Sequence, residues 1–113
     1  MKIPNAERAI IGQEKITLYL LNTEHRRGGS KAALLVSFGY TVDDWSRLAD
    51  DLRLYHLTAD ITIVRETPYG TRYEIRASLD TPNGRSLTVR SIWQIDIGTD
   101  YPRFITLFPD RAM

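Results

Sequence analysis

The second half of the chain consists of four extended segments separated by turn-forming residues, and this pattern constrains the fold more than any other feature. Residues 61–66, 71–79, 86–96 and 103–108 are rich in β-branched and aromatic side chains. Pro-Tyr-Gly and Pro-Asn-Gly sequences separate the first three segments, and such turns join neighbouring antiparallel strands. The pattern therefore predicts an antiparallel meander sheet of about four strands.

Alternation along these segments predicts which face of the sheet is buried, because successive side chains of a strand point to opposite faces. The predicted core face carries Ile61, Ile63, Tyr73, Ile75, Ala77, Leu79, Leu87, Val89, Trp93 and Ile95. The predicted opposite face carries Arg72, Glu74, Arg76, Thr88, Arg90 and Gln94.

The last extended segment fits either of two orientations. If Ile105 and Leu107 face the core, Thr106 shares the arginine-bearing face, and the flanking phenylalanines can stack on bases. The opposite parity buries Phe104 and Phe108 instead. Alternation alone leaves both orientations open.

The first half of the chain is predicted to be helical. Residues 31–38 form an apolar run that fits a short helix or a buried strand, and we favour a helix because Ser30 and Gly39 stand at cap positions. A loop is expected over residues 23–30, where the helical spacing is interrupted. The helix expected over residues 13–22 has an apolar stripe of Ile16, Tyr19 and Leu20.

A longer helix is expected from Thr41 to about residue 58, with Thr41 in a capping position. We interpret His56 as structural, because it continues the apolar stripe and a histidine in a last turn also suits the helix dipole. We expect this helix to pack on the sheet above Trp93. Its stripe consists of Val42, Trp45, Leu48, Ala49, Leu52 and Tyr55.

The 113 residues suffice for one core. We expect a single α+β domain over residues 1–113, with N-terminal helices (about 1–58) on one face of a C-terminal sheet (about 59–109). The absence of cysteine excludes disulfides and thiolate metal sites. Without a long apolar run or a signal-peptide pattern, we expect a cytoplasmic protein with no membrane partner.

The charge pattern gives only an indirect indication of a partner. A net charge of +1 does not by itself indicate nucleic-acid binding. The distribution is uneven, however, because no acidic residue lies between Glu24 and Asp43 and acids dominate the segment that follows. Most basic residues are arginines, which suit bidentate phosphate contacts, although a bias in genomic composition explains that preference equally well.

His25 is the histidine that the sequence places outside a packing stripe. It precedes Arg26, Arg27, two glycines, Ser30 and Lys31, so a group that titrates near neutrality lies within a basic, glycine-containing loop. Backbone amides that lead into a helix N-terminus also suit an anion. A solvated basic loop is the simpler interpretation of the same residues.

Several familiar kinds of site are excluded or unsupported. The Gly-Gly-Ser-Lys sequence lacks the earlier glycine of a phosphate-binding loop, and no Gly-x-Ser-x-Gly is present. Two separated histidines without paired carboxylates give little support for a metal, and we expect no cofactor. Histidine, basic side chains and hydroxyls do fit metal-independent RNA cleavage, in which the ribose 2′-hydroxyl attacks the adjacent phosphate.

Short motifs spread over most of the chain carry a resemblance to a known family. The chain resembles a small bacterial family of domains of unknown function, which looks like a relative of the barnase–EndoU–colicin–RelE (BECR) ribonuclease toxins. The matching pieces are Lys2-Ile3-Pro4-Asn5-Ala6, Tyr19-Leu20-Leu21-Asn22, His25-x-x-Gly28-Gly29-Ser30-Lys31-Ala32, Tyr69-Gly70-Thr71-Arg72-Tyr73, Thr81-Pro82-Asn83-Gly84-Arg85, Val89-Arg90-Ser91-x-Trp93 and Pro102-Arg103-Phe104-Ile105-Thr106-x-Phe108-Pro109.

The resemblance implies an α+β, RNA-cleaving toxin that a small antitoxin or immunity protein holds in check. We therefore assign His25 as general base or acid, Lys31 as phosphate clamp, Arg90 as stabiliser of the phosphorane and Thr106 as the group that orients the phosphate. If an inhibitor exists, we expect an acidic protein. The expected substrate-binding residues are Arg27, Ser30, Arg72, Arg76, Ser91 and Phe108.

Two positions depart from the family pattern. Arg26 stands where a proline is expected, which implies a less rigid loop after His25. Phe108 stands where a tyrosine is expected, so the last strand lacks a hydroxyl there and Thr106 would have to serve. The competing hypothesis is a non-catalytic interaction module, or an antitoxin-like protein, whose arginine-rich sheet face binds an acidic partner.

Overall fold

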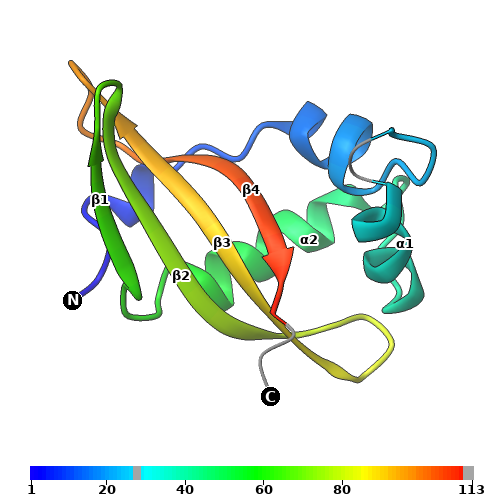
Figure 1. Cartoon of the computed structure of the whole chain (residues 1–113). Coiled ribbons are helices and arrows are strands. Elements are labelled where there is room, and N and C mark those ends of the chain that lie inside the picture. The colour runs from blue at the N-terminus through cyan, green and yellow to red at the C-terminus, as the bar shows by residue number, and fades with distance from the viewer. Residues whose placement is uncertain (27–28, 111–113) are drawn as a thin grey trace.

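The computed structural model describes residues 1–26 and 29–110, which form helical segments followed by a sheet (Figure 1). No helix in these two ranges is both long and apolar enough to cross a membrane. The helical segments are η1 (Ala6–Arg8), η2 (Lys15–Leu20), α1 (Gly29–Ser37), α2 (Trp45–Asp51) and η3 (Leu52–His56). The strands are β1 (Ile63–Thr67), β2 (Gly70–Asp80), β3 (Ser86–Asp96) and β4 (Arg103–Pro109).

The strands form the predicted antiparallel meander, in the order β1-β2-β3-β4. The two long central strands pair along their whole length, with Tyr73 opposite Trp93 and Arg76 opposite Arg90. These pairs lie on opposite faces, as the alternation predicts. The N-terminal segment adds an edge contact, since Ile10 forms a parallel bridge with Arg103.

The core lies between the sheet and the long helix, and the predicted α+β layout is confirmed. The helix formed by α2 and η3 runs behind the sheet in Figure 1, and its buried Leu48 and Leu52 belong to the same apolar cluster as Ile75 and Trp93. Trp93 is fully buried and meets Phe104 edge to face, with ring centroids 5.2 Å apart. We call the sheet face turned away from this helix the open face.

The apolar run over residues 31–38 is helical as far as Ser37, so the preferred alternative is confirmed, but the helix begins at Gly29 and Ser30 is therefore not its cap. Helix α1 ends where Gly39 adopts φ of +102°, a conformation that favours glycine. The hairpin turn between β2 and β3 holds this end of the helix, because Asn83 donates backbone and side-chain hydrogen bonds to the carbonyls of Phe38 (3.1 Å) and Ser37 (3.2 Å). The Pro-Asn-Gly turn therefore fixes α1 relative to the sheet.

The predicted start of the long helix is four residues too early. Thr41 Oγ1 accepts a hydrogen bond from the Asp44 amide (3.1 Å), but the helix begins at Trp45. Thr41 therefore organises a turn ahead of the helix, and Val42 is exposed rather than part of the stripe. From Leu52 onward the helix widens to π geometry, with the Leu57 amide bonded to the Leu52 carbonyl.

One predicted face assignment is wrong at the edge of the sheet. Ile63 pairs with Glu74 and so lies on the open face rather than in the core. In β4, Thr106 pairs with Ile92 but Phe104 pairs with Trp93, so Ile105 is an extra residue that forms a bulge.

The bulge in β4 combines the two orientations that alternation left open. Phe104 and Leu107 are buried in the core. Thr106 is half-buried and Phe108 is exposed, and both line a hollow on the open face together with Ile105. A single inserted residue therefore buries one phenylalanine and leaves the other exposed.

His56 is structural, as predicted, but it is buried and neutral rather than a cation at a helix end. Its Nε2 donates to the Ala77 carbonyl (3.0 Å), and its Nδ1 accepts from the Ser91 hydroxyl (2.6 Å). The Ser91 oxygen in turn accepts from Trp93 Nε1 (2.7 Å). Burial lowers the pKa of His56 to about 4, and each of these buried polar groups has a partner.

We predict that His56 makes stability depend on pH between about 6.5 and 4. In the unfolded chain His56 binds a proton near pH 6.5, whereas in the folded protein it does so only near pH 4. The free energy of unfolding therefore falls by up to about 3 kcal/mol as the pH is lowered from about 6.5 to 4. Urea unfolding at several pH values measures the effect. His56→Gln should lose this dependence, and an unchanged pH profile in that variant would contradict the assignment.

Candidate functional site

The centre of the candidate site is the ammonium group of Lys31, which joins three parts of the chain. Lys31 projects from the first turn of α1, and its Nζ donates hydrogen bonds to Tyr19 Oη on η2 and Thr106 Oγ1 on β4, each at 3.2 Å. An ammonium group has three N–H donors. Within residues 1–26 and 29–110, Lys31 uses two of them, in these two bonds. A cation flanked by two hydroxyls is thereby held at the junction of helix and sheet.

Aromatic rings surround this cation. The Lys31 Nζ lies 4.4 Å from the centroid of the Phe108 ring and 5.0 Å from that of Tyr19. The guanidinium carbon of Arg90 lies 5.9 Å from the same Phe108 centroid. Phe108 therefore lies within cation–π distance of both cations.

His25 belongs to the same cluster through Tyr19. The two rings meet edge to face, with centroids 4.8 Å apart and planes at 90°. The backbone holds His25 on both sides, because its amide donates to Asn22 (3.1 Å) and its carbonyl accepts from the Gly29 amide (2.9 Å). A Cβ on Gly29 would lie 2.7 Å from the Thr23 carbonyl oxygen, so this position suits only glycine.

A chain of polar contacts positions Arg72 on the open face. Arg72 Nη2 donates to Gln94 Oε1 (2.9 Å), and Gln94 Nε2 donates to Asp96 Oδ1 (2.6 Å). Asp96 also pairs with Arg103 at 2.6 Å, and these hydrogen bonds lower the pKa of the Asp96 carboxyl. The arginine is therefore held by a side chain that is itself oriented by an ion pair.

The second central arginine has a weaker partner. Arg90 Nη1 lies 3.7 Å from Glu74 Oε2, which is too long for a hydrogen bond. In the part of the chain that the structure describes, the buried Nε atoms of Arg72 and Arg90 have no hydrogen-bond partner. These two guanidinium groups therefore retain hydrogen-bonding capacity.

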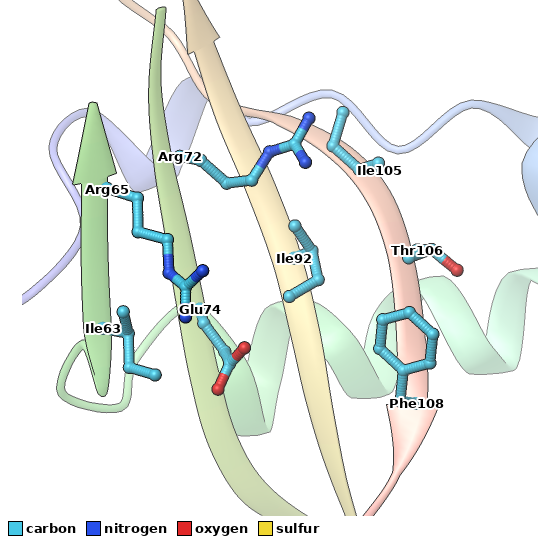
Figure 2. A pocket seen from close by; sticks show the side chains of 8 residues that line it. All are labelled: Ile63, Arg65, Arg72, Glu74, Ile92, Ile105, Thr106 and Phe108. Carbon is cyan, nitrogen blue, oxygen red and sulfur yellow. The ribbon is translucent and has the colours of Figure 1, made fainter. Parts of the chain in front are cut away.

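Two hollows adjoin the Lys31–Thr106 contact. The first, called the sheet hollow, has a volume of about 250 Å³ on the open face (Figure 2). The second, called the helix hollow, has a volume of about 540 Å³ and shares Ile105 and Thr106 with the first. The sheet hollow is lined by Ile63, Arg65, Arg72, Glu74, Ile92, Ile105, Thr106 and Phe108. The helix hollow is lined by Glu14, Lys15, Tyr19, Ile105 and Thr106.

The structure brings together the four residues to which the sequence assigns catalytic roles. Lys31 and Thr106 are in direct contact, His25 joins them through Tyr19, and Arg90 joins them through Phe108. These residues come from a loop, a helix and two strands. Acid–base, cationic and hydroxyl groups thus belong to one connected cluster of half-buried side chains.

The predicted binding residues are more scattered. Arg72 lines the sheet hollow and Ser30 is exposed at the start of α1, whereas Arg76 pairs with Asp110. Ser91 is fully buried on the core face, so a role in contacting substrate is wrong; strand alternation places it with Trp93. Arg27 lies outside the described residues.

Sequence reasoning missed Tyr19, Glu74 and Gln94 as members of the site. Tyr19 was assigned to an apolar stripe, and its ring does pack beside the core, but its hydroxyl reaches Lys31. Its place in the Tyr-Leu-Leu-Asn motif was the available signal. Glu74 and Gln94 were placed on the correct face, but their contacts depend on strand register.

A family comparison places this chain among known sequences. A family model described as a domain of unknown function (DUF6883) matches residues 2–111. The chain belongs to this family. A search of curated proteins gives no significant match.

A solved structure is similar in fold to this family member. It is described as a contact-dependent growth inhibition toxin–immunity protein complex from Klebsiella pneumoniae 342, and one of its chains superposes with a TM-score of 0.68 and 15% sequence identity. The match covers 89% of this chain and 99% of the other. At this identity the similarity concerns the fold.

Within the described ranges, no three His, Asp or Glu side chains are grouped so that they could hold a metal ion.

Proposed function

We propose that this protein is a toxin-like, metal-independent endoribonuclease of BECR type. The observation that carries the proposal is the Lys31 ammonium, held at 3.2 Å by both Tyr19 and Thr106 and adjoined by His25 and Arg90. Preorganised cations stabilise the dianionic phosphorane of RNA cleavage, and hydroxyl and imidazole groups transfer protons.

In the proposed reaction, a base removes the proton of the ribose 2′-hydroxyl, and the 2′ oxygen attacks the adjacent phosphorus. Lys31 and Arg90 stabilise the phosphorane, and Thr106 orients the phosphate by a hydrogen bond. An acid then protonates the departing 5′ oxygen, which gives a 2′,3′-cyclic phosphate and a 5′-hydroxyl. His25 takes one of the two proton-transfer roles, and Tyr19, which touches both His25 and Lys31, is the candidate for the other.

The phenylalanine at position 108, where a tyrosine is expected, is compatible with this chemistry. Phe108 has no hydroxyl, but it lies against both cations instead. The hydroxyl of Tyr19 lies next to the same ammonium group from the helical side. We therefore expect this chain to be active without a tyrosine in β4.

The solved toxin–immunity complex supports the toxin part of the proposal by analogy of fold. The complex also suggests the kind of partner, because it pairs a toxin with an immunity protein. RNA as substrate is supported by the chemistry of the site alone.

The direct test is incubation of purified protein with single-stranded RNA in the presence of a metal chelator. We expect fragments that end in a 2′,3′-cyclic phosphate, identified by mass spectrometry, and no cleavage of DNA of the same sequence, which lacks the attacking hydroxyl. Intact RNA at micromolar protein would overturn the proposal.

A non-catalytic interaction module is the second candidate, and the ion pairs of the sheet favour it. Arg76, Arg90 and Arg103 each face a carboxylate of the chain itself, as they would in a binding or structural surface. Induced expression separates the two functions. Growth arrest that a neighbouring small gene relieves supports the nuclease, whereas harmless overexpression supports the module.

We predict that an inhibitory partner is acidic and covers the region of His25 and Arg90. Attraction between oppositely charged surfaces accelerates association and is screened by salt. The association rate, measured by stopped-flow, should therefore fall steeply as ionic strength rises. A rate independent of salt, or an interface on the acidic segment around Asp43 and Asp51, would contradict this prediction.

A further inference from the structure

The sheet hollow has the composition of a pocket for a single flat ring. Its floor and one wall are apolar, formed by Ile63, Ile92, Ile105 and Phe108. Figure 2 shows that Arg72 extends across β3 above this floor and that Glu74 lies at the opposite end. The volume of about 250 Å³ is slightly below the roughly 300–1,000 Å³ of pockets for drug-sized ligands. That size suits one nucleobase.

Glu74 determines which kind of base fits in the hollow. Its side chain is only 17% exposed, and the 3.7 Å separation from Arg90 leaves the carboxylate oxygens able to accept further hydrogen bonds. Arg65 and Arg72 also line the hollow, so its charge does not exclude phosphate, but the apolar side chains of the lining match the flat face of a base rather than the backbone of RNA. The base must also present N–H donors to this carboxylate.

Guanine satisfies this requirement better than the other three bases. It carries two adjacent donors, N1–H and the N2 amino group, on its Watson–Crick edge, and a carboxylate accepts both at once. Its O6 and N7 are acceptors that suit an arginine. Arg72 is positioned for this contact because Gln94 holds one of its nitrogens at 2.9 Å.

We propose that the sheet hollow binds a guanine base next to the cleaved phosphate and makes the enzyme prefer guanine at that position. This inference rests on the proposed ribonuclease function. Thr106 connects the two sites, since it lines the hollow and also accepts the hydrogen bond from Lys31. The helix hollow, on the other side of Thr106, is then available to the neighbouring nucleotide.

The test measures binding separately from cleavage. Fluorescently labelled tetranucleotides that differ only in one central base, with 2′-deoxyribose throughout to prevent cleavage, are titrated by anisotropy. We expect the guanine oligonucleotide to bind about tenfold more tightly than the others, within the range of one bidentate base contact. In Glu74→Gln, which loses one acceptor oxygen, this ratio should fall to about two or less.

Glu66→Gln is the matched control, because Glu66 lies on β1 outside the hollow and interacts with Thr71. This variant should keep the full guanine preference. Equal binding of all four oligonucleotides by the wild-type protein overturns the proposal, as does an undiminished preference in folded Glu74→Gln. Cleavage without base preference leaves the nuclease function intact and refutes the guanine site alone. Guanine-selective binding without cleavage of RNA supports the guanine site and refutes the nuclease function.

Discussion

Replacing His25 with alanine should slow RNA cleavage by roughly 10²–10⁴-fold, the usual contribution of a positioned acid or base. The side chain lies in a loop and packs edge to face on Tyr19. Loss of such a pair costs at most about 1.5 kcal/mol, so the variant should remain folded. Single-turnover formation of the cyclic phosphate end measures the rate, and thermal unfolding measures the stability.

His56→Ala is the control for this experiment, because it removes the other histidine of the chain from the core. This variant should lose stability while its activity per folded molecule stays close to that of the wild type. Toxicity on expression should disappear in His25→Ala. Full cleavage activity in folded His25→Ala protein would refute the proton-transfer role.

Replacing Trp93 with alanine should lower the free energy of unfolding by about 3–5 kcal/mol, the range for truncation of a large buried aromatic residue. Trp93 is fully buried, contacts Phe104 and donates to Ser91. The substitution therefore leaves a cavity and removes a hydrogen bond from the buried chain that ends at His56. Urea denaturation at pH 7.5, with tyrosine fluorescence or circular dichroism, gives the change directly.

Trp45→Ala provides the comparison, because Trp45 is only partly buried at the start of α2. Trp45→Ala should lower the free energy of unfolding clearly less than Trp93→Ala does. A Trp93→Ala cost below about 1 kcal/mol would mean that the residue does not fill the core between sheet and helix.

The candidate site shows where local reasoning from sequence reaches its limit. His25, Lys31, Arg90 and Thr106 could be chosen from residue types, from strand alternation and from the family resemblance. Their common contact through Tyr19 and Phe108 could not be predicted from the sequence, because it requires α1 and η2 to dock beside β4. The tyrosine looked apolar because most of its ring does pack, and only the docked helices bring its hydroxyl to Lys31.

The sequence by itself determined the order of the elements, the meander and the buried face of β2 and β3. Two-residue alternation and turn residues are local properties, so they can be recognised in the sequence without knowledge of the whole fold. Only the tertiary structure decided the orientation of β4, where an extra residue at Ile105 changes the parity between Phe104 and Thr106. A bulge forms when pairing with the neighbouring strand and packing of the core are satisfied together, and neither is encoded in the spacing of one segment.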